Sequence, residues 1–138
     1  MRNNREYQIC KDIAIYLRLQ YPNVIFHFDL AGLNLSRAQS GMMKAIQGGR
    51  GWPDLFIAEP RLVFGATDDL PFGTNYNGLF IEVKAEDIRL RKNNGDPATP
   101  HINEQMDCLQ DLFNRGYFTV FACGFDEAKE LIDSYMRL

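Results

Sequence analysis

Long apolar runs and internal repeats are missing from this chain. No apolar run in its 138 residues approaches the ~18–20 residues that a membrane span requires. Arg2 and Arg5 stand near the N-terminus with no apolar stretch behind them, which argues against a signal peptide. No internal repeat and no low-complexity segment is present. We therefore expect a globular domain rather than a membrane, fibrous or repeat protein.

Cysteine is scarce, and histidine is scarcer. The three cysteines, Cys10, Cys108 and Cys123, are far apart and form no C-x-x-C pair. This pattern argues against a disulfide scaffold or a zinc site, and it predicts the reducing cytoplasm as the compartment. His27 and His101 also lack the spacing of metal ligands, so we interpret both as structural residues.

Neither sign of charge dominates the chain. Lys and Arg number 15 against 18 Asp and Glu, for a formal net charge of −3, which excludes a polybasic nucleic-acid binder but allows a local basic surface. The hydrophobic share of 46% and the charged share of 24% are close to globular averages. At this length one core buries enough surface without a staple, so we expect a single domain over residues 1–138.

Hydrophobic periodicity predicts helices that alternate with strands. The expected helices cover residues 6–20, residues 36–47 with Ser36 as cap, a segment that ends near Arg115 and is capped by Gly116, and a last segment capped by Asp126. The third helix is expected to have Ile102, Met106, Leu109 and Phe113 on one apolar face. The expected strands cover residues 24–29, 54–58, 79–85 and 118–123. Residues 61–78, whose turn residues include Asp68, Asp69 and Pro71, form either a long hairpin loop or a hairpin extension. Residues 89–100 form a polar loop. The order predicts an α/β fold with a central mixed sheet flanked by helices.

The run LFIEVK at residues 79–84 is the most informative strand. Its apolar start predicts a central strand, and Glu82 and Lys84 project from the same face because they are two residues apart. One interpretation is a solvated ion pair at a half-exposed strand end. The other is a carboxylate near the core, which is costly unless it is paired or bound to a metal.

A second candidate feature is the glycine-rich turn before the strand at 54–58. The sequence GGRGWPDLFI ends its turn in Pro53-Asp54 and lacks the pattern of a phosphate-binding P-loop. A β-turn in which Asp54 caps a backbone amide is the ordinary interpretation. However, the turn-rich stretch that follows can pair the two strands antiparallel and bring Asp54 beside Glu82. Trp52 either packs this turn, which we favour, or stacks on a base.

Two converging carboxylates and a lysine suit the chemistry of a phosphodiester. Oxygen ligands favour Mg²⁺, which is usually held by one or two carboxylates and substrate phosphates. The metal ion polarises the phosphate, and a nearby cation such as Lys84 stabilises the charge that develops.

The set Asp54, Glu82 and Lys84 resembles the PD-(D/E)XK nuclease superfamily. An acidic residue in the first helix (Glu6), the motifs GxGWPDL and IEVK, and Gln105 on a later helix that precedes Gly116 resemble its VRR-NUC branch. The resemblance extends from Glu6 to about residue 122. The stretch 58–78 is longer than a minimal hairpin, and the family pattern does not account for it.

The resemblance implies a restriction-endonuclease-like αβββαβ core and a Mg²⁺- or Mn²⁺-dependent endonuclease. Asp54, Glu82 and the backbone carbonyl of Val83 would hold the metal ion, and Lys84 would orient or activate the attacking water. Glu6 would reach the site from the first helix, and Gln105 would line it. Both lie on apolar helix faces, although a helix-dipole role for Glu6 and a backbone-satisfied role for Gln105 remain open.

The same resemblance implies the substrate and the assembly. Stand-alone members are small phage or bacterial proteins associated with branched DNA such as Holliday junctions, so the cytoplasm of a bacterium or of a phage-infected host is expected. Paired cuts in a four-way junction predict a two-fold homodimer. A nuclease for linear or flapped DNA and a non-cleaving DNA-binding module of the same fold are the alternatives. Six basic residues flank the site in sequence and are candidate DNA contacts, although each one taken singly is better interpreted as solvated surface charge: Arg37, Lys44, Arg50, Arg89, Arg91 and Lys92.

Overall fold

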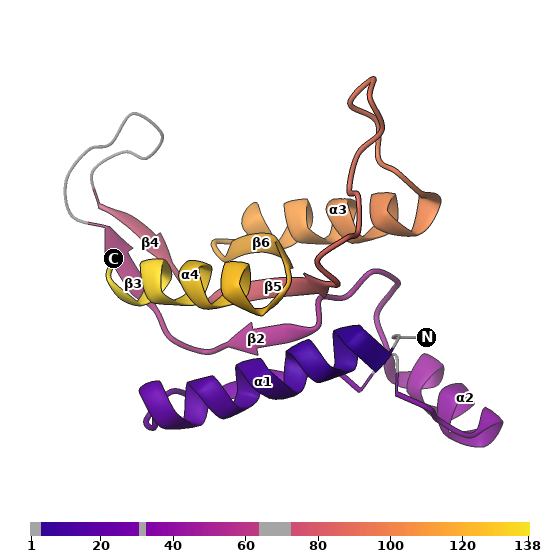
Figure 1. Ribbon diagram of the computed structural model, residues 1–138, viewed down its shortest axis with the longest axis horizontal. Helices are drawn as coiled ribbons and strands as arrows, with labels where there is room; N and C mark the ends of the chain where they lie inside the picture. The colour runs from indigo at the N-terminus through magenta and orange to yellow at the C-terminus, as the bar shows by residue number, and fades with distance from the viewer. Residues whose placement is uncertain (1–3, 31–32, 64–72) are drawn as a thin grey trace.

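The computed structural model describes residues 4–30, 33–63 and 73–138, in which helices alternate with strands (Figure 1). In chain order the elements are α1 (Asn4–Gln20), β1 (Phe26–Phe28), α2 (Arg37–Ile46), β2 (Leu55–Ile57), β3 (Arg61–Val63), β4 (Thr74–Tyr76), β5 (Leu79–Lys84), α3 (Pro100–Phe113), β6 (Phe118–Cys123) and α4 (Phe125–Met136). The predicted mixed α/β class is confirmed. In the described part of the chain, no helix combines the length and the apolar character needed to cross a membrane.

Four strands form the central sheet in the order β1-β2-β5-β6. β2 runs antiparallel to both β1 and β5, whereas β5 and β6 are parallel, so the sheet is mixed as predicted. Helix α3 provides the crossover that a parallel pair requires. All six residues of β5 are buried, which fits its place between two hydrogen-bonded neighbours.

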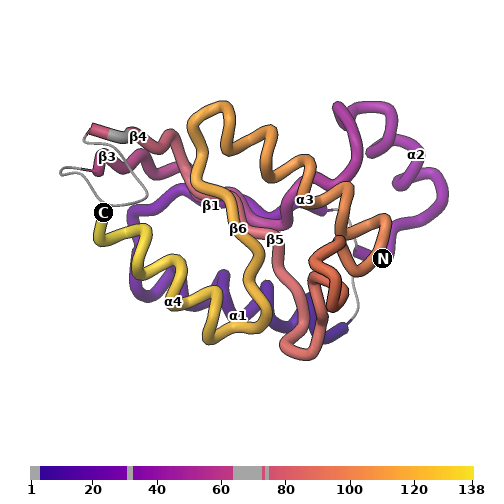
Figure 2. Tube along the Cα trace, turned by 90° about the horizontal axis from the view of Figure 1, so that it is seen from above, coloured from indigo at the N-terminus to yellow at the C-terminus, as the bar shows by residue number. Residues whose placement is uncertain are grey.

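Helices cover the two faces of the sheet unequally. Figure 2 shows the strands between α3 on one side and the pair α1 and α4 on the other. Leu79, Ile81 and Val83 of β5 join the main core with the buried faces of α1 and α4. Phe80, on the opposite face, packs with Leu109 and Leu112 of α3. Alternate residues of one strand therefore enter two separate clusters, as the period of a strand requires.

The described ends of the segment 61–78 pair as a hairpin extension, one of the two alternatives that the sequence left open. β3 and β4 pair antiparallel, with Leu62 opposite Asn75, and form a two-stranded sheet of their own. The expected turn with Asp68, Asp69 and Pro71 lies outside the described residues. The hairpin follows the end of β2 and precedes the start of β5, so it lies at the end of these strands away from Asp54 and Glu82.

The ends of the helices show which of the predicted caps form. Ser36 caps α2 through a capping box with Gln39, as its hydroxyl accepts from the Gln39 N–H and the Gln39 side chain accepts from Ser36 N–H. Gly116, with φ +94°, ends the turn after α3 as predicted. The predicted Asp126 cap is wrong, because Gly124 occupies the N-cap of α4 and Asp126 lies in the first helical turn, where its charge favours the helix dipole.

The buried side of α3 is also shifted from the prediction. Ile102 and Leu109 are buried as expected, but Leu112 rather than Phe113 completes the buried stripe. Phe113 is 46% exposed. Met106 is only partly buried, because the sheet meets positions 105, 109 and 112, and Gln105 takes the inward position expected of it.

Candidate active site

The strand register brings Asp54 beside Glu82. β2 and β5 pair with Leu55 opposite Ile81, and continuing this register by one residue places Asp54 opposite Glu82. The backbone N–H of Val83 donates to Asp54 Oδ2 at 2.8 Å, which ties the carboxylate to β5. Two acidic side chains that are distant in sequence thus lie on the face of the sheet that α3 covers.

Glu82 is buried in a polar setting. The residue is 4% exposed, and its Oε1 accepts a hydrogen bond from Gln105 Nε2 at 2.7 Å. The same oxygen lies 3.4 Å from the ammonium of Lys84, which is itself buried. Glu82 Oε2 is buried without a hydrogen-bond partner among the residues that the structure describes. A buried carboxylate oxygen without a hydrogen-bond partner raises the free energy of the folded state. A functional reason for its position is therefore expected.

The acidic pair also changes the proton affinity of Glu82. Burial raises the pKa of Glu82, the charge of Asp54 raises it further, and Lys84 offsets part of the effect, so that the pKa is about 9. The carboxyl group therefore holds a proton at neutral pH when no other cation is near. A divalent cation would relieve this repulsion and favour the ionised form.

The donor set fits magnesium or manganese better than zinc. Among residues 4–30, 33–63 and 73–138, no group of three or more His, Cys, Asp or Glu side chains could hold a metal ion. The site instead offers two carboxylates with an orphaned oxygen, and Mg²⁺ commonly takes one or two carboxylates and completes its shell with water and phosphate. The residues present therefore suit Mg²⁺ or Mn²⁺, while the binding of an ion and the contribution of the Val83 carbonyl stay predictions.

Gln105 and His101 lie on one face of α3, one turn apart. Gln105 is 5% exposed and faces the sheet, as predicted. Its Nε2 lies 2.7 Å from Glu82 Oε1 and 3.2 Å from His101 Nε2. His101 was interpreted as structural on ligand spacing alone. Its i,i+4 relation to Gln105 is the signal in the sequence that could have linked it to the site.

Glu6 occupies the first turn of α1 and is partly exposed. The guanidinium of its neighbour Arg5 pairs with Glu86, which follows the end of β5. The start of α1 therefore lies near the carboxyl end of β5. A direct role of Glu6 at the metal site stays a prediction.

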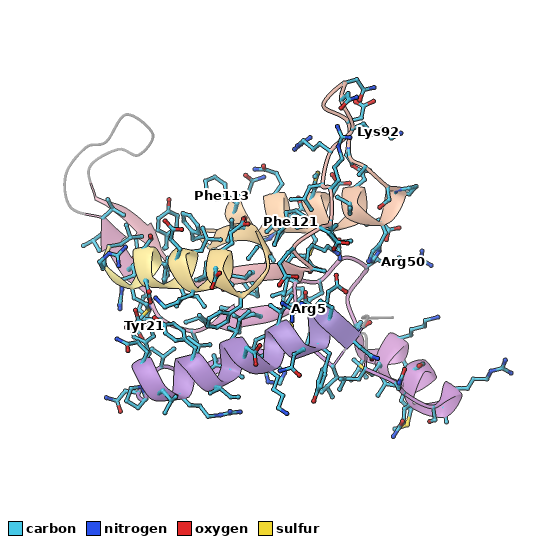
Figure 3. All side chains as sticks on the ribbon, in the orientation of Figure 1. Arg5, Tyr21, Arg50, Lys92, Phe113 and Phe121 are labelled. Atoms are coloured by element: carbon cyan, nitrogen blue, oxygen red, sulfur yellow. The ribbon has the colours of Figure 1, made fainter. Side chains whose placement is uncertain are left out.

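The six candidate DNA-binding residues are all exposed, but they differ in what they contact. Arg37 and Lys44 belong to α2, and Arg50 lies 3.7 Å from Glu104. Arg89 donates to the carbonyl of Arg91 and Arg91 to that of Gly95, so both guanidinium groups brace the loop after β5. Lys92 lies in the outer part of this loop, and Figure 3 shows Lys92 and Arg50 on the same side of the molecule.

The turn before Asp54 packs closely on α3. Gly51 has φ +78°, and a Cβ added there would lie 2.5 Å from the carbonyl oxygen of Glu104, so only glycine allows this approach. Trp52 packs edge-on against Phe80 with ring centroids 5.3 Å apart, in line with the favoured interpretation, yet it stays 50% exposed. Between this turn and α3 runs a groove of about 650 Å³.

Comparisons with known proteins give a likeness of fold. No protein-family model matches the chain. No curated protein matches it either. A solved structure described as "VRR_NUC domain protein" superposes with a TM-score of 0.58 over 100% of this chain and 93% of that chain, at 21% sequence identity. The chain is therefore similar in fold, over its whole length, to a VRR_NUC domain protein.

Proposed function

We propose that this protein is a metal-dependent endonuclease of the PD-(D/E)XK superfamily that hydrolyses phosphodiester bonds in DNA. The observation that carries the proposal is the pairing of half-buried Asp54 with buried Glu82, with buried Lys84 beside them and one Glu82 carboxylate oxygen left without a partner among the described residues. A domain that needed only stability would gain from apolar residues at these positions, because buried charges seldom stabilise a fold. The similarity to a VRR_NUC domain protein supports the same assignment.

Each residue of the site has a distinct task in this proposal. Asp54 and Glu82 would hold Mg²⁺ or Mn²⁺, together with the carbonyl of Val83. When bound, the ion would polarise the scissile phosphate and make water a stronger nucleophile. Lys84 would orient the attacking water and stabilise the charge on the phosphate, and its ammonium is held in place by Glu82 at 3.4 Å.

Gln105 would keep the Glu82 carboxylate in a fixed orientation. Its Nε2 donates to Glu82 Oε1, so the other oxygen, Oε2, is the one that stays available for a ligand. Glu6 would act from the start of α1, at the edge of the site. Both residues are second in importance to Asp54, Glu82 and Lys84.

The proposed substrate is branched DNA such as a Holliday junction, and the proposed assembly is a homodimer. One chain carries one acidic pair and would cut one strand, so symmetric resolution of a four-way junction needs two copies. The exposed basic residues on α2, on the turn before β2 and on the loop after β5 would contact phosphates around the site.

The test is to incubate the protein with a four-way junction, a flapped duplex and a linear duplex, each with Mg²⁺ or with EDTA. We expect metal-dependent nicking that is strongest on the four-way junction, and a loss of about 10²–10³-fold in Lys84→Ala because a charge that stabilises the transition state is removed. Glu130→Gln, on exposed α4 surface, is the matched control. Nicking that Lys84→Ala leaves undiminished would refute the proposal.

The same substrates separate the alternatives. Faster cleavage of the flapped or linear duplex than of the junction would refute branched DNA as the preferred substrate, but it would still support a nuclease. DNA binding without cleavage, and without Mn²⁺ binding that depends on Asp54, would indicate a non-cleaving module with this fold.

A further inference from the structure

The amide nitrogen of Gln105 has two N–H groups and lies within hydrogen-bond distance of two side chains. One points to Glu82 Oε1 at 2.7 Å, and the other to His101 Nε2 at 3.2 Å. We propose that His101 is a positioning residue that fixes the Gln105 amide and, through it, the Glu82 carboxylate. This inference rests on the proposed role of Glu82 in holding a metal ion.

The chemistry of the amide explains why a fixing contact is needed. A glutamine amide can rotate by half a turn, which exchanges its oxygen for its nitrogen. When Glu82 is ionised, as a bound cation would favour, the rotated form would place Gln105 Oε1 against Glu82 Oε1, and two acceptors repel each other. The amide oxygen does not select one orientation of the group, because Gln105 Oε1 is buried and has no hydrogen-bond partner among the described residues. Only the nitrogen side, through Glu82 and His101, defines the orientation.

His101 can accept this bond only in one tautomer. Its Nε2 must present a lone pair to Gln105, so the proton of the neutral ring must be on Nδ1. Nδ1 lies 3.8 Å from Glu104 Oε2, whose negative charge favours a proton on that nitrogen. Glu104, His101, Gln105 and Glu82 thus form a chain of contacts that leads from the surface of α3 to the buried carboxylate.

The position of His101 makes the inference testable without unfolding the protein. Its side chain is 69% exposed, so replacing it removes little packing. The variants are His101→Ala, which removes the acceptor, and His101→Gln, which restores an acceptor oxygen at a similar reach. Asn103→Ala is the matched control, because Asn103 is an exposed residue on the same part of α3.

Two readouts separate positioning from a merely structural role. In the metal-free protein, NMR of the Gln105 side-chain amide should show shifted resonances and faster hydrogen exchange in His101→Ala, and a return toward wild type in His101→Gln. Calorimetry should show Mn²⁺ affinity about three- to tenfold lower in His101→Ala, below the 10–100-fold typical of a direct partner of a ligand. The thermal midpoint should not change in any of the three variants.

Unchanged Gln105 amide resonances in His101→Ala would overturn the inference, and so would unchanged Mn²⁺ affinity. Glu82→Gln is measured alongside to distinguish this failure from failure of the proposed function. Loss of Mn²⁺ binding in Glu82→Gln but not in His101→Ala would refute only the role of His101. Full Mn²⁺ binding in Glu82→Gln would refute the metal site itself.

Discussion

The two faces of β5 are equally buried and carry opposite kinds of side chain. Leu79, Ile81 and Val83 point into the core beneath α1 and α4. On the other face, Phe80 is followed by Glu82 and Lys84, which are 4% and 7% exposed beneath α3. The first face lowers the free energy of the fold by apolar burial, whereas the second buries charge at a cost. Burial alone therefore does not distinguish a residue that stabilises the core from a residue of the candidate site.

The largest effect on stability is expected at the apolar face. Ile81→Ala should lower the free energy of unfolding by about 2–5 kcal/mol, because Ile81 is fully buried and its loss leaves a cavity. Urea denaturation measures the loss, with Leu19→Ala, a substitution at a 79% exposed position, as the control. A loss as small as that of the control would show that the main core does not depend on this face of β5.

On the polar face of β5, replacing a buried side chain is expected to raise the free energy of unfolding rather than lower it. The raised pKa of Glu82, about 9, means that the folded chain keeps a proton that the unfolded chain releases above pH 4.5. Stability is therefore full below pH 4.5 and falls as the pH rises toward 9. Glu82→Gln removes this penalty and should raise stability at pH 8 in EDTA by about 1–3 kcal/mol, although activity is lost. Denaturation of both proteins at pH 5 and pH 8 checks the difference, and a destabilised variant at pH 8 would contradict it.

A smaller effect is expected where α1 meets α4. Burial alone would raise the pKa of Asp133, but hydrogen bonds from Lys129, Tyr16 and Tyr21 lower it to about 2. A depressed pKa contributes stability above the unfolded value of 3.8, and this contribution is lost as the pH falls from there to about 2.

Asp133→Asn should therefore cost about 1–2 kcal/mol at pH 7, less than the full shift implies because the side chain is partly open to solvent. The difference from wild type should shrink as the pH is lowered to 2. Thermal melts across this range measure it, beside Asp107→Asn on the exposed side of α3. A difference that is independent of pH would show that the effect is steric rather than electrostatic.

The smallest effect is expected at α2, which contributes to neither face of β5. None of its residues is buried, and Met42 is 70% exposed. Met42→Gln should change the free energy of unfolding by less than about 0.5 kcal/mol. Chemical denaturation checks this value. A loss above about 1 kcal/mol would show that α2 packs against another surface in solution.

Local signals predicted most of the fold, and the misses have local causes. The capping box at Ser36, the glycine at 116 and the strand Phe118–Cys123 follow from residues that are close together in the chain. The Asp126 cap failed because Gly124, with φ +95°, made the turn one residue before α4.

The candidate site was predictable in its main residues but not in its connections. Asp54, Glu82, Lys84 and Gln105 come together because strand register and helix phase are both encoded in apolar periodicity. His101 was missed because its contact depends on the rotation of α3 relative to β5. The bracing of the loop by Arg89 and Arg91 depends likewise on backbone carbonyls that no sequence pattern marks.

By itself the sequence determined the alternation of helices and strands, the central place of β5 and the pair of carboxylates with a lysine. These features depend on the chemistry and spacing of neighbouring residues. Tertiary structure alone decided that Glu82 lies between Asp54, Lys84 and Gln105, that its Oε2 has no partner among the described residues, and that its pKa is raised to about 9. The physical reason is that desolvation and Coulomb interaction depend on distances through space, which a chain acquires only when it folds.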